Sequence, residues 1–445
     1  SYPPGPPVVS SSPIAQIQFG LRFQRAPLTV LSDWHHTYGD VFHLQIGADF
    51  HQYFFIHPDD IHTVLVAQSD KFHKSPDYRD EQRGLARFLG SGLLTSDGDF
   101  WKRQRKLAQP AFHTQRIDAY AQTMVDYTQR MLAEWQDGER RDIRHAMMRL
   151  TRLIVAKTLF DADVTADSSR VDDALNTFMR MSNDTDLIPS WVPTPKHLRE
   201  RRAVSDLDEI IYGFVAEWRR QGIDRGDLLS MLLLAEDDQG QGMTDKQVRD
   251  EVVTLFLAGH ETTANALNWT WMLLAQHSEV EAKLHAELDR VLDGRPPTLA
   301  DLRALTYTDW VIKESMRLYP PAWGFGRQAI DDVEVGGYRV PRGTVVSILP
   351  YLTHRDPAWW GADAEAFRPE RWSADPPHKY AYIPFGGGPH VCIGNSFATM
   401  EARLLLATIA QQVQLRLDPG QKVEMEPLIT LRPRGGLPMK LAQRR

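Results

Sequence analysis

The chain contains a single cysteine, Cys392, within the glycine-rich segment 385–394, Phe-Gly-Gly-Gly-Pro-His-Val-Cys-Ile-Gly. A lone thiol cannot form an intramolecular disulfide or a multi-cysteine zinc or iron–sulfur site. It can bind one metal as an axial ligand, attack an electrophile, or lie buried as a small inert hydrophobe. Glycines 386–388 carry no Cβ, so the backbone can turn there and approach a flat, bulky partner closely. This glycine-rich context favours a role for Cys392 as an axial metal ligand.

The residues that follow the cysteine predict a helix over 397–410. A thiol just before a helix lies near unpaired N–H groups and the positive end of the helix dipole. We therefore expect the thiolate to be favoured at Cys392, with backbone N–H groups donating to its sulfur.

A long apolar helix with a polar centre is predicted from residue 244 to about residue 277. A capping box, Thr244 with Gln247, marks its beginning. Residues 258–263, Ala-Gly-His-Glu-Thr-Thr, lie in its middle, where glycine and consecutive threonines are poor helix formers. A threonine hydroxyl can bond back to a carbonyl one turn earlier and bend the helix. The alternatives are a site that opens the helix locally, which we favour, and a buried helix with satisfied polar groups.

The segment Phe385-x-x-Gly388-x-His390-x-Cys392-x-Gly394 resembles the haem-binding signature of the cytochrome P-450 monooxygenases. That signature usually has arginine where this chain has His390, and an imidazole can also donate to a haem propionate. The resemblance implies haem b with Cys392 as the axial iron ligand, and contacts from Phe385, Gly394 and Ala258. It also implies that Glu261 and Thr262 are the acid–alcohol pair that delivers protons during oxygen activation.

Further motifs occur in the family's order. Trp101 and Arg105 are four residues apart and share a helix face. The resemblance implies that they hold a haem propionate, as does Arg327; an ordinary basic helix is the alternative for the first pair. By the same resemblance, Glu314, Arg317 and Arg371 form a buried ion-paired triad that supports the cysteine loop.

The expected fold is mostly α with a small β region: a triangular prism-like helical domain with haem buried between the long central helix and the cysteine loop. We expect one haem domain over residues 1–445, with an extended, proline-rich stretch at 1–13. Alternating patterns predict strands within 41–57, 333–340 and 343–349. Apolar content of 42% and a net charge of −7 are typical of a globular cytoplasmic enzyme and do not favour nucleic-acid binding. The polar centre of the long helix argues against a membrane span.

The resemblance implies a monooxygenase that inserts oxygen from O₂ into an apolar small molecule, such as a fatty acid or terpenoid. No flavin or nicotinamide domain follows in this sequence, so we expect electrons from a separate ferredoxin or flavodoxin with its reductase. Its expected docking site is Lys102, Arg103, Lys106 and Arg116, for which an ordinary solvated helix face is the alternative. A peroxide-driven peroxygenase and a non-catalytic haem sensor or carrier are the alternatives. The expected substrate pocket consists of Phe88, Leu89, Leu93, Leu94, Leu255, Ala258, Ala322, Trp323, Phe325 and Leu431.

Overall fold

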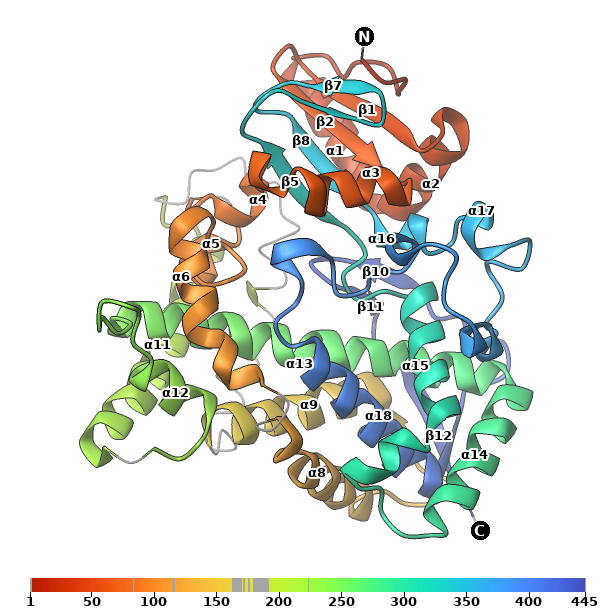
Figure 1. Ribbon diagram of the computed structural model, residues 1–445. Helices are drawn as coiled ribbons and strands as arrows, with labels where there is room; N and C mark the ends of the chain where they lie inside the picture. Colours follow the sequence, from red (N-terminus) through yellow and green to blue (C-terminus); the bar gives the residue numbers. More distant parts are fainter. Residues whose placement is uncertain are drawn as a thin grey trace.

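The computed structural model describes residues 2–82, 84–113, 117–161, 170, 173–174, 177–178, 192–222 and 224–444. A region rich in strands lies above a larger helical region in Figure 1, and the two chain ends lie at opposite sides of the molecule. The chain enters through the strand-rich region, builds most of the helical region, returns to the strands, and finishes among the helices.

A five-stranded sheet forms the centre of the strand-rich region. Its order is β1-β2-β8-β5-β3, with β2 and β8 parallel and the other neighbours antiparallel. The predicted strands within 41–57 and 343–349 are therefore present in this sheet. Its bounds are β1 Val41–Ile46, β2 Phe50–Phe55, β3 Phe72–Lys74, β5 Phe325–Ala329 and β8 Val345–Ile348.

Helices α1 (Pro13–Arg25) and α2 (Pro27–Tyr38) precede this sheet and were not anticipated from the sequence. Each has proline in its first turn, where a missing N–H leaves no hydrogen bond unmade. Residues 2–12 before them contain no helix or named strand, as expected of a proline-rich segment. Short elements follow: α3 (Pro58–His62), the π-helical turn η1 (Thr63–Ala67), η2 (Ser69–Lys71), α4 (Pro76–Arg79) and α5 (Ala86–Leu89).

Helix α13 (Asp245–Gln276) crosses the middle of the helical region (Figure 1). The predicted capping box of Thr244 and Gln247 is formed at its start. Most of its side chains are buried on every side, because it packs against α9, α11, α15 and α18. The helices around it are α6 (Gly98–Ala108), α8 (Ala121–Ala133), α9 (Ile143–Phe160), α11 (Pro195–Gln221), α12 (Leu228–Leu234), α14 (Ser278–Leu292), α15 (Thr306–Leu318) and α18 (Asn395–Gln412).

Short strands and helical turns complete the described chain. The predicted hairpin at 333–340 is formed by β6 and β7, and two further sheets near the C-terminus were not anticipated. The strands are β4 (Arg140–Asp142), β6 (Val333–Val335), β7 (Tyr338–Val340), β9 (Val413–Arg416), β10 (Met425–Pro427), β11 (Leu431–Pro433) and β12 (Pro438–Gln443). The turns are η3 (Gln109–Phe112), η4 (Leu299–Arg303), α16 (Pro350–Thr353), α17 (Pro357–Trp360), η5 (Pro369–Ser373), η6 (Lys379–Ala381) and η7 (Gly388–His390).

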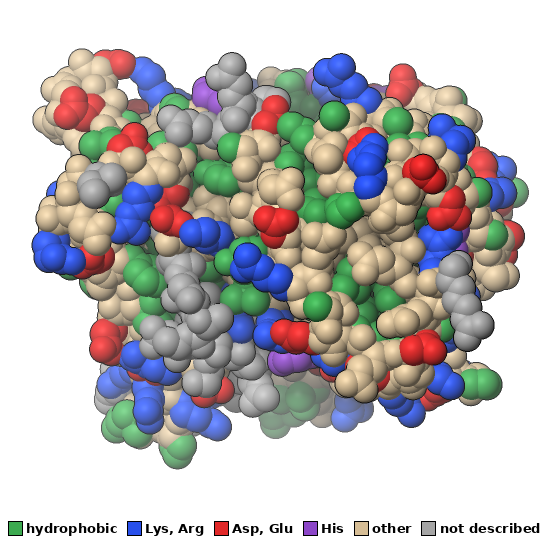
Figure 2. All heavy atoms as spheres, turned by 90° about the horizontal axis from the view of Figure 1, so that it is seen from below, with side chains coloured by type: hydrophobic (Ala, Val, Ile, Leu, Met, Phe, Trp, Pro, Cys, Tyr) green, Lys and Arg blue, Asp and Glu red, His purple; other side chains and the backbone are tan. Residues whose placement is uncertain are grey.

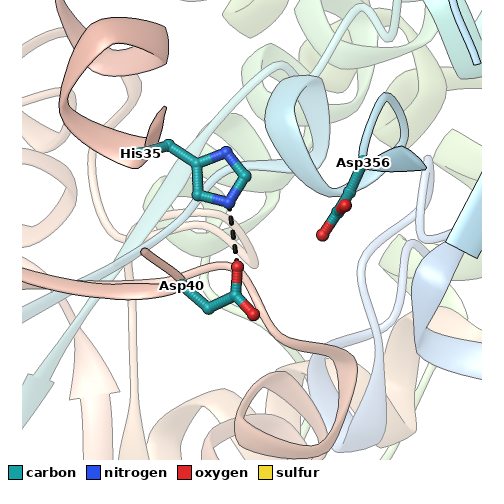
Figure 3. A group of neighbouring side chains, drawn as sticks. All are labelled: His35, Asp40 and Asp356. Atoms are coloured by element: carbon teal, nitrogen blue, oxygen red, sulfur yellow. Dashed lines mark hydrogen bonds and ion pairs between the residues drawn. The ribbon is translucent and has the colours of Figure 1, made fainter. Parts of the chain in front are cut away.

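A polar cluster joins the strand-rich region to the start of α17. The Nε2 atom of His35 lies 2.9 Å from an Asp40 oxygen, and Asp356 faces both residues (Figure 3). Asp356 also accepts a hydrogen bond from the Ala358 N–H and so caps α17. Because His35 is paired with Asp40 and Asp356 caps a helix, this group has a structural role.

No helix in the described part of the chain has both the length and the apolar character needed to cross a membrane. Figure 2 shows the face turned away from the strand-rich region, where Lys and Arg side chains are interspersed with Asp and Glu.

Candidate active site

A cavity of about 360 Å³ lies between the middle of α13 and the loop that carries Cys392. All ten residues predicted to act in catalysis or to hold the cofactor contribute to its wall. They are Trp101, Arg105, Ala258, Glu261, Thr262, Arg327, Phe385, His390, Cys392 and Gly394. Four distant parts of the sequence therefore meet at one cavity.

The cysteine loop is closed by its own backbone. The Cys392 N–H donates to the Phe385 carbonyl at 2.9 Å, and the Gly386 N–H donates to the Ile383 carbonyl at 3.0 Å. Gly388 has a φ of +65°, and a Cβ there would lie 1.8 Å from the carbonyl oxygen of Leu65 in η1. Only glycine allows this approach, so the N-terminal region directly determines where the loop lies.

The Cys392 sulfur faces the cavity, so part of it is accessible, but the thiol lies deep inside the protein. Burial raises the pKa of the thiol, although the Gly394 N–H and Arg105 act in the opposite direction. The expectation that the loop alone favours the thiolate is therefore wrong. The loss of hydration raises the pKa of Cys392 by more than the helix dipole lowers it, because α18 begins only at Asn395, three residues after the thiol. A bound metal cation would reverse this balance, since a coordinating thiol loses its proton.

The predicted triad side chains meet in the interior. Glu314 accepts two hydrogen bonds from Arg317, at 2.8 and 2.9 Å, and one from Arg371 at 3.2 Å. The Trp372 indole adds a fourth at 2.9 Å, and the Arg368 backbone N–H adds a fifth at 3.2 Å. Glu314 and Arg317 are both 0% exposed, so this pair is fully removed from water.

His354 connects this cluster to the cysteine loop. Arg317 donates to the His354 carbonyl at 2.8 Å, and His354 Nε2 accepts a hydrogen bond from the Ile383 N–H, also at 2.8 Å. Burial and the neighbouring arginines lower the pKa of His354 to about 3, so the ring stays neutral and can accept. The triad is therefore linked to the cysteine loop through the His354 imidazole.

One end of the cavity is cationic. Lys74 of β3 and Arg327 of β5 are directly paired across the sheet, and Arg105 of α6 lines the same cavity. Like charges placed opposite each other are unfavourable. Asp97 offsets part of this repulsion, because it attracts both Lys74 and Arg327 and accepts a hydrogen bond from the Lys74 backbone N–H at 2.9 Å. Burial lowers the pKa of Lys74 to about 7, and burial also lowers the pKa of Arg327. Sequence reasoning missed Lys74, because a lysine in a short strand carries no motif.

His390 and Trp101 lie beside these cations. Their rings are 3.9 Å apart between centroids. His390 Nδ1 is buried and has no hydrogen-bond partner among the described residues, whereas Arg105 donates to the Val391 carbonyl at 2.9 Å. Burial lowers the pKa of His390 to about 3, so the ring is neutral. Arg105, Arg327, Lys74 and the unsatisfied imidazole nitrogen could together hold the carboxylates of a buried group that also reaches Cys392.

The polar centre of α13 faces the other side of the cavity. The Thr262 hydroxyl donates to the Ala258 carbonyl at 2.8 Å, which is the back-bond expected from the sequence. The helix continues through this point. Glu261 is buried, and its Oε1 accepts a hydrogen bond from the Thr430 hydroxyl at 2.7 Å. Burial raises the pKa of Glu261, while Thr430, Arg432 and Arg144 oppose that change.

The predicted substrate pocket is partly wrong. Leu89, Leu93, Leu94, Leu255, Ala258, Ala322 and Phe325 line the cavity, but Phe88, Trp323 and Leu431 do not. Phe88 packs against Phe178, and Trp323 instead donates its indole N–H to the Leu428 carbonyl at 2.8 Å. Leu431 is fully buried behind the wall. The wall also contains residues that the sequence did not indicate: Tyr78, Phe112, Leu159, Phe178, Ile429 and Thr430.

The comparisons with known proteins agree with this site. Residues 3–437 match the family described as Cytochrome P-450. The chain therefore belongs to the cytochrome P-450 family and is a haem-thiolate monooxygenase that binds haem b. The cationic end, the unsatisfied His390 nitrogen and the thiol at Cys392 all fit a porphyrin with two propionates.

Similar proteins include two from Streptomyces melanosporofaciens. The chain is 37% identical to cyclooctatin synthase over 92% of its own length and 90% of that protein. It is 38% identical to cyclooctat-9-en-7-ol 5-monooxygenase, over 89% and 86% of the two chains. It is also 34% identical to the pentalenene oxygenase of Streptomyces avermitilis, over 92% and 91%.

Proposed function

We propose that this monooxygenase hydroxylates a terpenoid. The observation that supports this proposal most directly is the cavity itself. Beyond the cationic end, its walls consist mainly of leucine, phenylalanine and alanine side chains. Such walls bind an apolar substrate by burying its surface and leave few polar groups to bind a charged head group. The similarity to cyclooctat-9-en-7-ol 5-monooxygenase and pentalenene oxygenase supports a terpenoid over a fatty acid.

We propose the following roles for the residues of the site. Cys392 holds the haem iron, and Lys74, Arg105, Arg327, Trp101 and His390 hold the propionates. When bound, the haem supplies oxygen activation by two electrons and two protons, with thiolate donation favouring O–O cleavage.

The residues of α13 manage protons in this proposal. Glu261 is buried, and burial raises its pKa, so it holds its proton to a higher pH than a solvated glutamate does and can release that proton into the cavity. Thr262 presents a hydroxyl oxygen at the cavity wall while its hydrogen bonds to Ala258. That oxygen can accept a bond from water and so order a proton path from Glu261. A peroxide-driven enzyme would not need this pair.

A substrate titration tests the proposed class. Cyclic diterpene and sesquiterpene alcohols, and fatty acids of equal carbon number, are added to the ferric protein while the Soret band is followed. Terpenoids are expected to shift the band at lower concentration than fatty acids. Leu255→Trp, which fills the cavity, should abolish the shift, whereas Leu234→Trp, on an exposed part of α12, should not. Fatty acids binding more tightly than every terpenoid would contradict the proposal.

We propose a ferredoxin or flavodoxin with its reductase as the electron donor, docking on the exposed side of α6. The described cations there already have acidic neighbours: Lys102 with Asp99 at 3.1 Å and Lys106 with Asp238 at 2.6 Å, all four side chains well exposed. Arg103 pairs with Asp237 at 2.7 Å, and Arg116 lies outside the described residues. Exposed pairs of this kind are worth at most about 1 kcal/mol, so acids of a partner can replace them.

Two reversed charges test this docking site. Reduction by an acidic ferredoxin should slow in the double variant Lys102→Glu, Lys106→Glu, and the effect should weaken with added salt. The matched control is Lys379→Glu, at the exposed first residue of η6. Unchanged reduction by acidic donors would exclude this surface.

A single haem domain over residues 1–445 and a cytoplasmic location stay proposals. The first is supported by the sheet, in which β2 of the N-terminal part pairs with β8 from residues 345–348.

A further inference from the structure

The geometry points to Thr430 as a positioning residue that holds the buried acid Glu261 by a direct hydrogen bond to its Oε1 and stabilises the ionised form of that acid. This inference rests on the proposed role of Glu261 and adds a residue outside α13 to it. Three observations support it: the direction of a hydrogen-bond chain, the burial of the group, and the rigidity of the hairpin that carries Thr430.

The hydrogen-bond chain runs from Asn265 through Thr430 to Glu261. The Asn265 amide N–H donates to the Thr430 oxygen at 3.1 Å, and the Thr430 hydroxyl donates to Glu261 Oε1 at 2.7 Å. When Glu261 is ionised, its oxygens can only accept, so the single hydrogen of the Thr430 hydroxyl is directed to Oε1.

The chain is closed to bulk water. Glu261 is 6% exposed, Thr430 is 6% exposed and Asn265 is fully buried. The charged groups that face Glu261 are Arg144 from α9 and Arg432 from β11. Arg432 is itself paired with Glu426 at 2.7 Å, which weakens its pull on Glu261. Among the hydrogen bonds to this acid, the Thr430 hydroxyl lowers the pKa of Glu261 most, and the Asn265 amide adds a smaller effect in the same direction.

Thr430 sits at the tip of the hairpin between β10 and β11, and the tip is held on several sides. The Trp323 indole donates to the Leu428 carbonyl at 2.8 Å. The Trp269 indole of α13 donates to the Leu431 carbonyl at 3.0 Å. The Leu431 N–H in turn donates to the Pro321 carbonyl at 2.9 Å. These bonds fix the hydroxyl relative to α13.

The same tip forms part of the substrate wall, because Ile429 and Thr430 both line the cavity. Because the tip is held on several sides, it presents the cavity wall and the hydroxyl that binds Glu261 as one fixed unit.

The test measures the ionisation of Glu261 by infrared difference spectroscopy on the holoenzyme. The carboxylic C=O band that Glu261→Gln removes is titrated with pH in each protein. Thr430→Val keeps the shape of the side chain and removes the hydroxyl, so the band should persist to a pH about one unit higher. Thr430→Ser keeps the hydroxyl and should titrate like the wild type. A Thr430→Val midpoint equal to that of the wild type overturns the inference.

Two additions keep the result interpretable. Thr430→Ala replaces the valine variant if that protein does not fold, and the same upward shift is expected. The second readout is the rate at which the dithionite-reduced protein returns to its ferric spectrum in air-saturated buffer. Its pH midpoint should move with the infrared midpoint. If Glu261→Gln leaves that pH profile unchanged, the proposed role of Glu261 fails, while the infrared shift still decides the hydrogen bond to Thr430.

Discussion

Replacing Glu314 by glutamine should strongly destabilise the protein. The carboxylate accepts hydrogen bonds from Arg317, Arg371 and Trp372. Glutamine offers one acceptor oxygen and turns two N–H groups toward donors that already fill the site. Glu314 and Arg317 are fully buried, so solvent screens neither charge. Removing one partner of such a pair costs about 3–5 kcal/mol, a large part of the usual 5–15 kcal/mol.

The assay is urea unfolding of the holoenzyme, followed by far-UV circular dichroism and by Soret absorbance. Because Arg317 binds the His354 carbonyl and His354 binds the Ile383 N–H, the cysteine loop should loosen with the cluster. The Soret signal of Glu314→Gln should therefore be lost at a lower urea concentration than in the wild type, and no later than the helical signal.

Glu217→Gln is the matched control. Glu217 pairs with Arg220, also three residues later, at 2.6 Å, but the two side chains are 43% and 72% exposed, and exposed pairs contribute little. Its unfolding free energy should match that of the wild type within experimental error. If Glu314→Gln is also within about 1 kcal/mol of the wild type, the reasoning about a buried uncompensated charge is wrong for this site.

Three further predictions concern the haem site and its support. Cys392→Ser should lose the red-shifted Soret band of the reduced carbon-monoxide complex, measured beside wild-type protein of equal haem content; an unchanged band would exclude the sulfur ligand. Thr262→Val should lower the product formed per O₂ consumed about tenfold or more, while Thr263→Val, whose hydroxyl makes a longer back-bond of 3.3 Å, should change this ratio less. His354 has a pKa of about 3 when folded and near 6.5 when unfolded, so it contributes stability above pH 6.5 that is lost as pH falls toward 3. His354→Gln keeps a neutral acceptor for Ile383, and the difference in unfolding free energy between pH 7 and pH 5 should be smaller in that variant; an equal difference would assign the acid sensitivity to other groups.

The sequence predicted the parts of the site that are encoded within a few residues. The cysteine loop, the capping box at Thr244 and the threonine back-bond at Thr262 depend on local geometry, and each is present. Contacts that depend on the folded arrangement were predicted only where the family resemblance supplied them, as for Glu314 and Arg371.

The errors share a physical cause, which is burial by distant segments. The pKa of Cys392 is raised because the whole loop is desolvated, and no local pattern reports that. Trp323 faces the β10–β11 hairpin instead of the cavity, because its indole bonds to Leu428, more than a hundred residues away. Lys74 and Thr430 were missed for the same reason. Each gains its importance from neighbours in another strand or helix.

The contact between Gly388 and the Leu65 carbonyl limits how this enzyme can be recombined with its relatives. Chimeras that exchange the first eighty residues would bring a different turn against the loop that carries the iron ligand. A shift of a few tenths of an ångström in that turn is transmitted to the sulfur, because nothing compressible lies between the two backbones. Crossover points for such libraries should therefore keep residues 63–67 and 385–394 from the same parent.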